Sequence, residues 1–168
     1  MTVEVSRTGA GDCTLEFSPG LSLRSSVAAV EVNGHGAPFR VTSSASDQHV
    51  TMRIPLTQAN STIRIRLKND FGVSVANVLP PLGSASQGLR VLSETWNSAR
   101  TQMTLSLSGL AGRSYELSVW NPSQVAAVSG GKLEDVRADQ ATLVVEFPTG
   151  NPESYVHRDV GLTFAGGK

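Results

Sequence analysis

The sequence predicts an all-β fold built from antiparallel sheets, chiefly because of the spacing of its apolar residues. Apolar and polar residues alternate strictly in many short runs, of which 61–68 (Ser-Thr-Ile-Arg-Ile-Arg-Leu-Lys) is the clearest. Turn-forming pairs such as Asn33-Gly34 and Gly130-Gly131 separate these runs. No window longer than two helical turns combines helical spacing with a capping residue. Such alternation is typical of strands with one buried and one solvated face, as in antiparallel sheets.

The alternation places fourteen strands along the chain, in two sets of seven. The first set covers 2–7, 13–17, 27–32, 37–42, 48–54, 61–68 and 71–76. The second set covers 88–95, 101–107, 114–120, 124–128, 131–136, 141–147 and 155–164. Between the sets, 80–88 starts with two prolines, which cannot donate ladder hydrogen bonds, and continues with Gly and Ser. We therefore expect a first module at 1–79, a linker at 80–88 and a second module at 89–168.

Seven short strands in about 80 residues, with frequent turns, are typical of an immunoglobulin-like β-sandwich. We predict two such sandwiches in tandem, with about seven strands each. A weak internal repeat fits this division: Val-Ala-Ala-Val occurs at both 27–30 and 125–128, each before a Gly-containing turn, although chance similarity is the alternative to duplication. Modules this small bury little of their surface, so we expect the halves to pack together with Val78, Leu79 and Leu82 at their junction.

Composition excludes several classes of partner. The 168 residues include 14 basic and 14 acidic side chains, which gives zero formal charge, and nucleic-acid binding usually needs a basic domain or face. No apolar run approaches the roughly 20 residues of a membrane helix. We therefore expect neither a nucleic-acid nor a membrane partner. Cys13 is the only cysteine and falls on the apolar side of its strand, where we expect it to be buried.

The sequence offers no pattern that indicates catalysis or metal binding. It lacks a Gly-x-Ser-x-Gly elbow and a phosphate-binding loop, and His35, His49 and His157 are not spaced as zinc ligands. We expect no metal, no cofactor and no enzymatic activity. Acidic residues fall at polar positions of the alternating strands, as Glu16 and Glu116 do, which places them on solvated sheet faces. The alternative is a hydrolase whose carboxylates meet at the junction of the two halves.

Two aromatic residues fall on the polar side of their strands, and this placement suggests a ligand site. Trp120 shares a face with Glu116 and Ser118, and Tyr155 shares a face with His157. Exposed rings can stack on sugars while polar neighbours bond the hydroxyls, so Trp120, Tyr155 and His157 are candidate ligand-binding residues. The alternative is that each ring covers a sheet edge or the junction. Trp96, near a strand end, is expected to close the bottom of the second core.

Four basic residues form a second candidate surface. Arg53, Arg64, Arg66 and Lys68 would share one outward face if 48–54 and 61–68 pair as a hairpin through 55–60. Such a patch suits an anionic polymer or an acidic partner. The alternative is a solvated sheet face whose charges discourage edge-to-edge aggregation.

Three segments resemble the immunoglobulin-like accessory modules of large secreted bacterial proteins, including glycoside hydrolases. They are Val-Ala-Ala-Val-Glu-Val-Asn-Gly at 27–34, Val-Thr-Met-Arg-Ile-Pro-Leu at 50–56, and the run from 61 to 72 that ends in Asn-Asp-Phe-Gly. In the second half, 114–122 and Val-Gly-Leu-Thr-Phe at 160–164 are similar to the last β-sandwich of such enzymes. The resemblance implies that Met1 begins an excised piece and that catalysis resides upstream. It assigns no site residue.

The sequence as a whole favours a non-catalytic C-terminal accessory region of a larger exported bacterial protein. Its expected role is to stabilise or dock an upstream domain of the parent chain. The first alternative is a carbohydrate-binding module that uses surface aromatics and has a polysaccharide as its partner. We expect an extracellular or periplasmic location as part of the parent. Cytoplasm is the alternative, because the N-terminus reads directly into a strand rather than a signal peptide.

Overall fold

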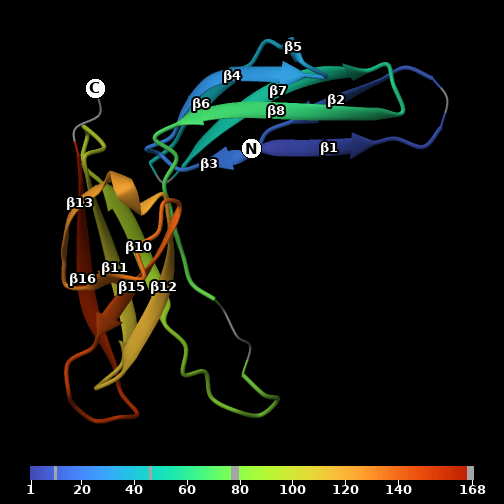
Figure 1. Ribbon diagram of the computed structural model, residues 1–168. Helices are drawn as coiled ribbons and strands as arrows, with labels where there is room; N and C mark the ends of the chain where they lie inside the picture. The colour runs from blue at the N-terminus through green and yellow to red at the C-terminus, as the bar shows by residue number, and fades with distance from the viewer. Residues whose placement is uncertain (10, 46, 77–79, 166–168) are drawn as a thin grey trace. The chain divides into compact units, whose positions relative to one another are not determined.

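The computed structural model describes residues 1–9, 11–45, 47–76 and 80–165 (Figure 1). Regular structure in these ranges is β, apart from one short 3-10 helix, η1 (Pro122–Gln124). The predicted all-β class is therefore confirmed. The chain divides into two compact units, Met1–Asp70 and Phe71–Lys168, each with its own hydrophobic core. Among the described residues, no helix is long and apolar enough to cross a membrane.

The first unit encloses its core between two sheets. Its strands are β1 (Thr2–Ser6), β2 (Cys13–Phe17), β3 (Gly20–Leu21), β4 (Ser26–Val32), β5 (His35–Gly36), β6 (Arg40–Ser43), β7 (Gln48–Leu56) and β8 (Asn60–Lys68). One sheet has the order β1-β8-β4-β5, and in the other β7 pairs with β2, β3 and β6. Alternate residues of β7 and β8, such as Met52 and Ile63, point into the same core because strand side chains alternate between faces.

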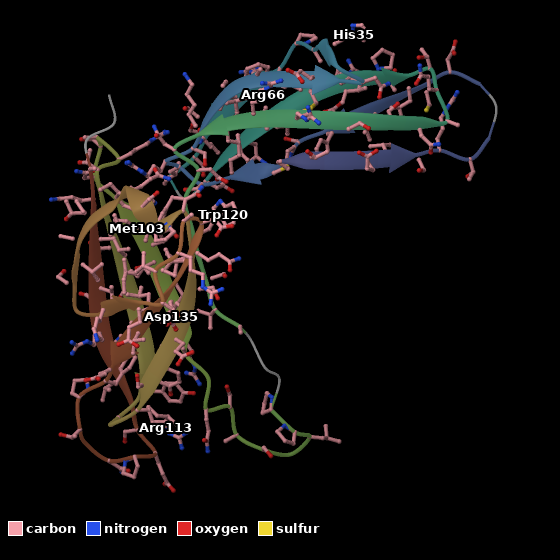
Figure 2. The ribbon with its side chains drawn as sticks, in the orientation of Figure 1. His35, Arg66, Met103, Arg113, Trp120 and Asp135 are labelled. Atoms are coloured by element: carbon pink, nitrogen blue, oxygen red, sulfur yellow. The ribbon has the colours of Figure 1, made fainter. Side chains whose placement is uncertain are left out.

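The second unit also has two sheets around one core. Its strands are β9 (Gly72–Ser74), β10 (Arg90–Trp96), β11 (Gln102–Leu110), β12 (Ser114–Trp120), β13 (Val125–Ser129), β14 (Lys132–Glu134), β15 (Gln140–Glu146) and β16 (Tyr155–Phe164). The sheets have the orders β10-β11-β16-β13 and β14-β15-β12-β9. Arg113, in the turn before β12, lies at the opposite end of this unit from Trp120 (Figure 2).

Aromatic rings fill one end of the second core. The ring of Trp96 stacks on Phe164 with centroids 5.2 Å apart, and Phe71 meets Phe164 edge-on at 4.7 Å. Trp96 is partly buried against the core, and its indole Nε1 donates to Glu94 Oε1 at 2.6 Å. The predicted packing role of Trp96 is confirmed.

All fourteen predicted strands are present, and the described residues add the two short strands β3 and β5. The unit boundary, however, lies at Asp70/Phe71, ahead of the predicted linker at 80–88. The last strand of the predicted first module, β9, pairs with β12 of the second unit, and Phe71 is buried in the second core. Alternation predicts where a strand lies but not which strand it pairs with, so the sequence could not show that β9 belongs to the second unit.

Two further expectations about burial were wrong. Cys13 is exposed because it is the first residue of β2, where the core no longer covers the apolar side of the strand. Leu82 is fully exposed in the connection between β9 and β10. Val78 and Leu79, which were expected beside it, lie outside the described residues.

Candidate functional site

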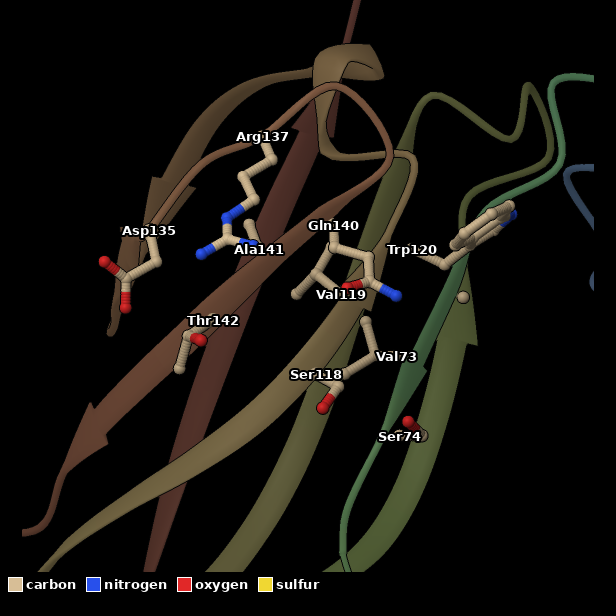
Figure 3. Close-up of a pocket in the computed structure, with 11 residues that line it drawn as sticks. Val73, Ser74, Ser118, Val119, Trp120, Asp135, Arg137, Gln140, Ala141 and Thr142 are labelled. Atoms are coloured by element: carbon tan, nitrogen blue, oxygen red, sulfur yellow. The ribbon is translucent and has the colours of Figure 1, made fainter.

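A groove lies on the outer face of the β14-β15-β12-β9 sheet (Figure 3). Its volume is about 530 Å³, which is within the range of roughly 300–1,000 Å³ typical of small-molecule sites. Trp120 stands at one side of the groove, while Arg137 and Asp135 extend over the other (Figure 3). All of its lining residues belong to the second unit.

The register of three strands builds the floor of the groove. Ser118 of β12 pairs with Ser74 of β9 on one side and with Thr142 of β15 on the other. One row along, Trp120 lies between Gly72 and Gln140. Directly paired residues of antiparallel strands project to the same face, so a row of three hydroxyls runs beside a row that holds the indole and the amide.

The connection between β14 and β15 forms the groove wall, and backbone hydrogen bonds fix it. The Arg137 amide donates to the Gln140 carbonyl at 2.8 Å, and the Asn121 amide donates to the Asp139 carbonyl at 2.8 Å. Asp135 and Asn121 both adopt left-handed backbone conformations, with φ of 49° and 53°. Asn and Asp enter this region more readily than other non-glycine residues, so both suit the turns that follow β12 and β14.

The groove presents polar groups that are available to a ligand. Trp120 is 42% exposed although it is a large aromatic residue. Within the described part of the chain, the side chains of Gln140, Thr142 and Ser118 make no hydrogen bond to protein, and Arg137 and Asp135 enter no ion pair. The groove therefore combines an aromatic face with hydroxyl, amide, carboxylate and guanidinium groups.

The structure does not bring Tyr155 and His157 to this groove. Both belong to β16 of the other sheet, on the opposite side of the core from Trp120. The Tyr155 hydroxyl lies 3.0 Å from the Ser86 carbonyl and 3.1 Å from the Gly88 carbonyl, and the Arg90 guanidinium lies 4.0 Å from its ring centroid. Tyr155 therefore holds the segment that enters β10, and His157 is exposed two residues along the same face.

The predicted basic patch is divided, because β7 and β8 do not form a hairpin. They belong to different sheets, so Arg53 projects from one outer face of the first unit while Arg64, Arg66 and Lys68 project from the other. Residues 57–59 therefore connect the two sheets, because β7 and β8 bury side chains in the same core from opposite sides. Carboxylates also neutralise part of each face: Arg53 lies 3.8 Å from Glu16, and Arg66 lies 2.9 Å from Glu31.

The first unit holds a small polar cluster around His49. Its Nε2 lies 3.1 Å from Asp47 Oδ2, and its Nδ1 lies 3.2 Å from the Ser18 carbonyl. The Ser18 carbonyl and then Asp47 raise the pKa of His49, and hydrogen bonds from Ser44 and then His49 lower the pKa of Asp47. Asp47 contacts both the Ser44 hydroxyl and the imidazole, which differs from a catalytic triad, where the imidazole itself contacts the serine hydroxyl.

Among the described residues, no group of three or more His, Cys, Asp or Glu side chains is placed to hold a metal ion. Comparison with known proteins identifies no relative: no protein family, no curated protein and no solved structure matches the chain.

Sequence reasoning found Trp120 and missed the other groove residues. The alternation of β12 placed the indole on the polar face, and the structure agrees. The charged run from Glu134 to Asp139 indicates an exposed polar loop, but nothing in the sequence shows which sheet the loop overhangs. The contribution of Gly72 to Ser74 depends on the β9–β12 pairing, which joins segments far apart in the chain.

Proposed function

We propose that this chain is a non-catalytic accessory region of a larger exported bacterial protein, and that its second unit binds carbohydrate. The observation that carries this proposal is the exposed Trp120 indole at the side of a groove lined with polar groups. The face of an indole suits the apolar face of a sugar ring, and nearby hydroxyl and amide groups suit its hydroxyls.

The carboxylates of the chain support binding rather than hydrolysis. Glycoside hydrolysis ordinarily uses two carboxyl groups on either side of the scissile bond. Of the residues that line the groove, Asp135 alone carries a carboxylate. Elsewhere, Glu16 and Glu116 are exposed at the polar positions where the alternation predicted them.

The strand pairing of the first unit supports the immunoglobulin-like part of this proposal. In such sandwiches the second strand pairs with the fifth, and the third pairs with the sixth. Without the two short strands β3 and β5, the second, third, fifth and sixth strands of this unit are β2, β4, β7 and β8. In the structure β2 pairs with β7 and β4 pairs with β8, as in that pattern. The second unit has a different order. Its strand β11 pairs with the last strand, β16, and the next strand, β12, pairs with β15, so the β12–β15 pair lies within the β11–β16 pair along the chain. We assign immunoglobulin-like pairing to the first unit alone.

Docking of an upstream domain is a second candidate function, and exposed apolar residues on two edge strands favour it. Val41 lies on β6, and Val91 and Leu92 lie on β10, each at the edge of its sheet. Apolar side chains on an edge are a feature that isolated proteins usually avoid.

In the parent protein, Val91→Ser with Leu92→Ser should lower the unfolding temperature of the upstream domain, whereas an unchanged temperature would argue against docking there.

Affinity electrophoresis in gels that contain soluble polysaccharides tests the carbohydrate proposal. At least one glycan should retard the chain, and Trp120→Ala should weaken that retardation about tenfold or more because the stacking surface is lost. Trp120→Phe keeps an aromatic face and should retain part of the binding. Tyr155→Phe, on the other sheet, is the matched control and should bind as the parent does. Retardation that survives Trp120→Ala, or its absence with every glycan, would contradict the proposal.

A further inference from the structure

We infer that the groove takes a neutral glycan, with adjacent hydroxyls of one sugar bridging Asp135 and Arg137 while a sugar ring stacks on Trp120. This inference rests on the proposed carbohydrate-binding function and adds the chemical class of the ligand. It follows from the charges of the groove, from its hydrogen-bonding groups and from the fixed position of its wall.

The groove is balanced in charge. Its lining includes one carboxylate, that of Asp135, and one guanidinium, that of Arg137. A uronate, sulfate or phosphate group bound to Arg137 would therefore also meet a negative charge on the same wall. Lys132, on the neighbouring strand β14, lies 2.8 Å from Glu134, so the pair adds no net charge beside the groove. This balance disfavours an acidic glycan through repulsion from Asp135, whereas a neutral glycan meets no such repulsion.

The hydrogen-bonding groups match polyhydroxylated ligands. An ionised carboxylate only accepts hydrogen bonds, a guanidinium only donates them, and hydroxyl and amide groups do both. A sugar hydroxyl can donate to Asp135 while its neighbour accepts from Arg137, and the remaining hydroxyls can reach Gln140, Thr142 or Ser118 on the floor. An apolar ligand would leave these groups without partners, which costs binding energy.

Backbone hydrogen bonds hold the wall that carries both charged residues. The Asn121 amide ties the connection to the end of β12 through the Asp139 carbonyl, and the Arg137 amide closes the turn onto Gln140. Asp135 keeps its left-handed conformation within this frame. A wall held in this way loses little conformational entropy on binding, which favours recognition of one hydroxyl arrangement.

The experiment compares neutral with acidic soluble polysaccharides as probes. Galactomannan, mixed-linkage β-glucan and soluble starch are the neutral probes, and polygalacturonate and alginate are the acidic ones. We expect retardation by a neutral probe, nearly unchanged from about 0.05 to about 0.5 M salt because no net charge is paired. Asp135→Asn and Arg137→Gln should each weaken it about tenfold. Asn tolerates the left-handed backbone, so Asp135→Asn removes the charge without moving the wall.

Matched controls separate local effects from folding. Asp159→Asn, on the outer face of the other sheet, and Arg113→Gln, at the far end of the unit (Figure 2), should bind as the parent does. Circular dichroism melts of each variant show whether it is folded.

Three results would overturn the inference, and they differ in what they mean for the proposed function. Salt-sensitive retardation by the acidic probes alone would overturn the neutral class and leave carbohydrate binding in place. Neutral retardation that Asp135→Asn and Arg137→Gln do not change in folded protein would overturn the bridging role alone. Retardation by no probe of either kind would overturn both.

Discussion

His49 lies between two hydrogen-bond acceptors, and this position makes its protonation state matter. Both ring nitrogens must carry a proton to donate to the Ser18 carbonyl and to Asp47 at once, so these two acceptors stabilise the protonated ring relative to the neutral one. The pKa of His49 is accordingly raised above its ordinary value of 6.5. We expect a proton NMR titration to place the pKa of His49 above that of His49 in the urea-unfolded chain.

The sign of the stability effect follows from the two pKa shifts. A raised folded-state pKa at His49 contributes stability that is complete below its unfolded-state pKa and is lost as the pH rises through the folded-state value. The lowered pKa of Asp47 contributes stability above its unfolded-state pKa that is lost as the pH falls through the folded-state value. The first unit should therefore be most stable between these two titrations. His49→Gln should remove the decrease in the free energy of unfolding on the alkaline side, which urea unfolding at several pH values measures. An unchanged pH profile of stability would contradict this role of His49.

Single residues show what alternation can and cannot predict. It placed Trp120 and Cys13 on the correct faces of their strands, because face follows directly from sequence spacing. It misjudged the burial of Cys13, since burial at a strand end depends on what the other sheet covers. It left the role of Tyr155 open between ligand binding and edge cover, and only the Ser86 and Gly88 carbonyls show that its hydroxyl holds a neighbouring segment.

At the level of elements, the end of β11 packs against aromatic rings that leave no room for a side chain. An added Cβ at Gly109 would lie 2.6 Å from Tyr115 Cε2 and 2.8 Å from Phe147 Cε2. These rings meet edge-on at 5.5 Å, and the Tyr115 hydroxyl accepts from the Leu110 amide at 3.0 Å, so neither ring moves freely.

Gly109→Ala should therefore destabilise the second unit by about 1–3 kcal/mol, the usual cost of overpacking a core. Equilibrium unfolding in urea measures this change. Gly36→Ala is the matched control, because an added Cβ there meets nothing within 4 Å. A Gly109→Ala variant as stable as Gly36→Ala would show that the rings relax at little cost.

Strand positions were predictable from the sequence, but strand partners were not. Period-two alternation is a local signal, and all fourteen predicted strands are present. Pairing depends on contacts between distant segments, so β7 and β8 looked like a hairpin although they lie in different sheets. The basic patch depended on that hairpin and was divided. The groove escaped prediction for the same reason, since its floor needs β9 beside β12.

At the level of the whole molecule, each unit has its own core, and the division falls at Asp70/Phe71. Glycan binding, as proposed, uses residues of the second unit alone. The first unit should therefore be dispensable for binding, provided that the second unit keeps every strand that completes its sheets.

This dependence on β9 makes two fragments differ sharply. Residues 71–168 retain β9 and Phe71, whereas residues 80–168, cut at the linker predicted from the sequence, lack both. Loss of the buried Phe71 ring alone should destabilise the shorter fragment by about 3–5 kcal/mol. The same cut leaves β12 as an open edge that favours association. Urea unfolding and size-exclusion chromatography should find a stable, monomeric, glycan-binding longer fragment and a weakened, self-associating shorter one. Equal stability and equal glycan binding in the two fragments would mean that β9 completes neither the second core nor the groove.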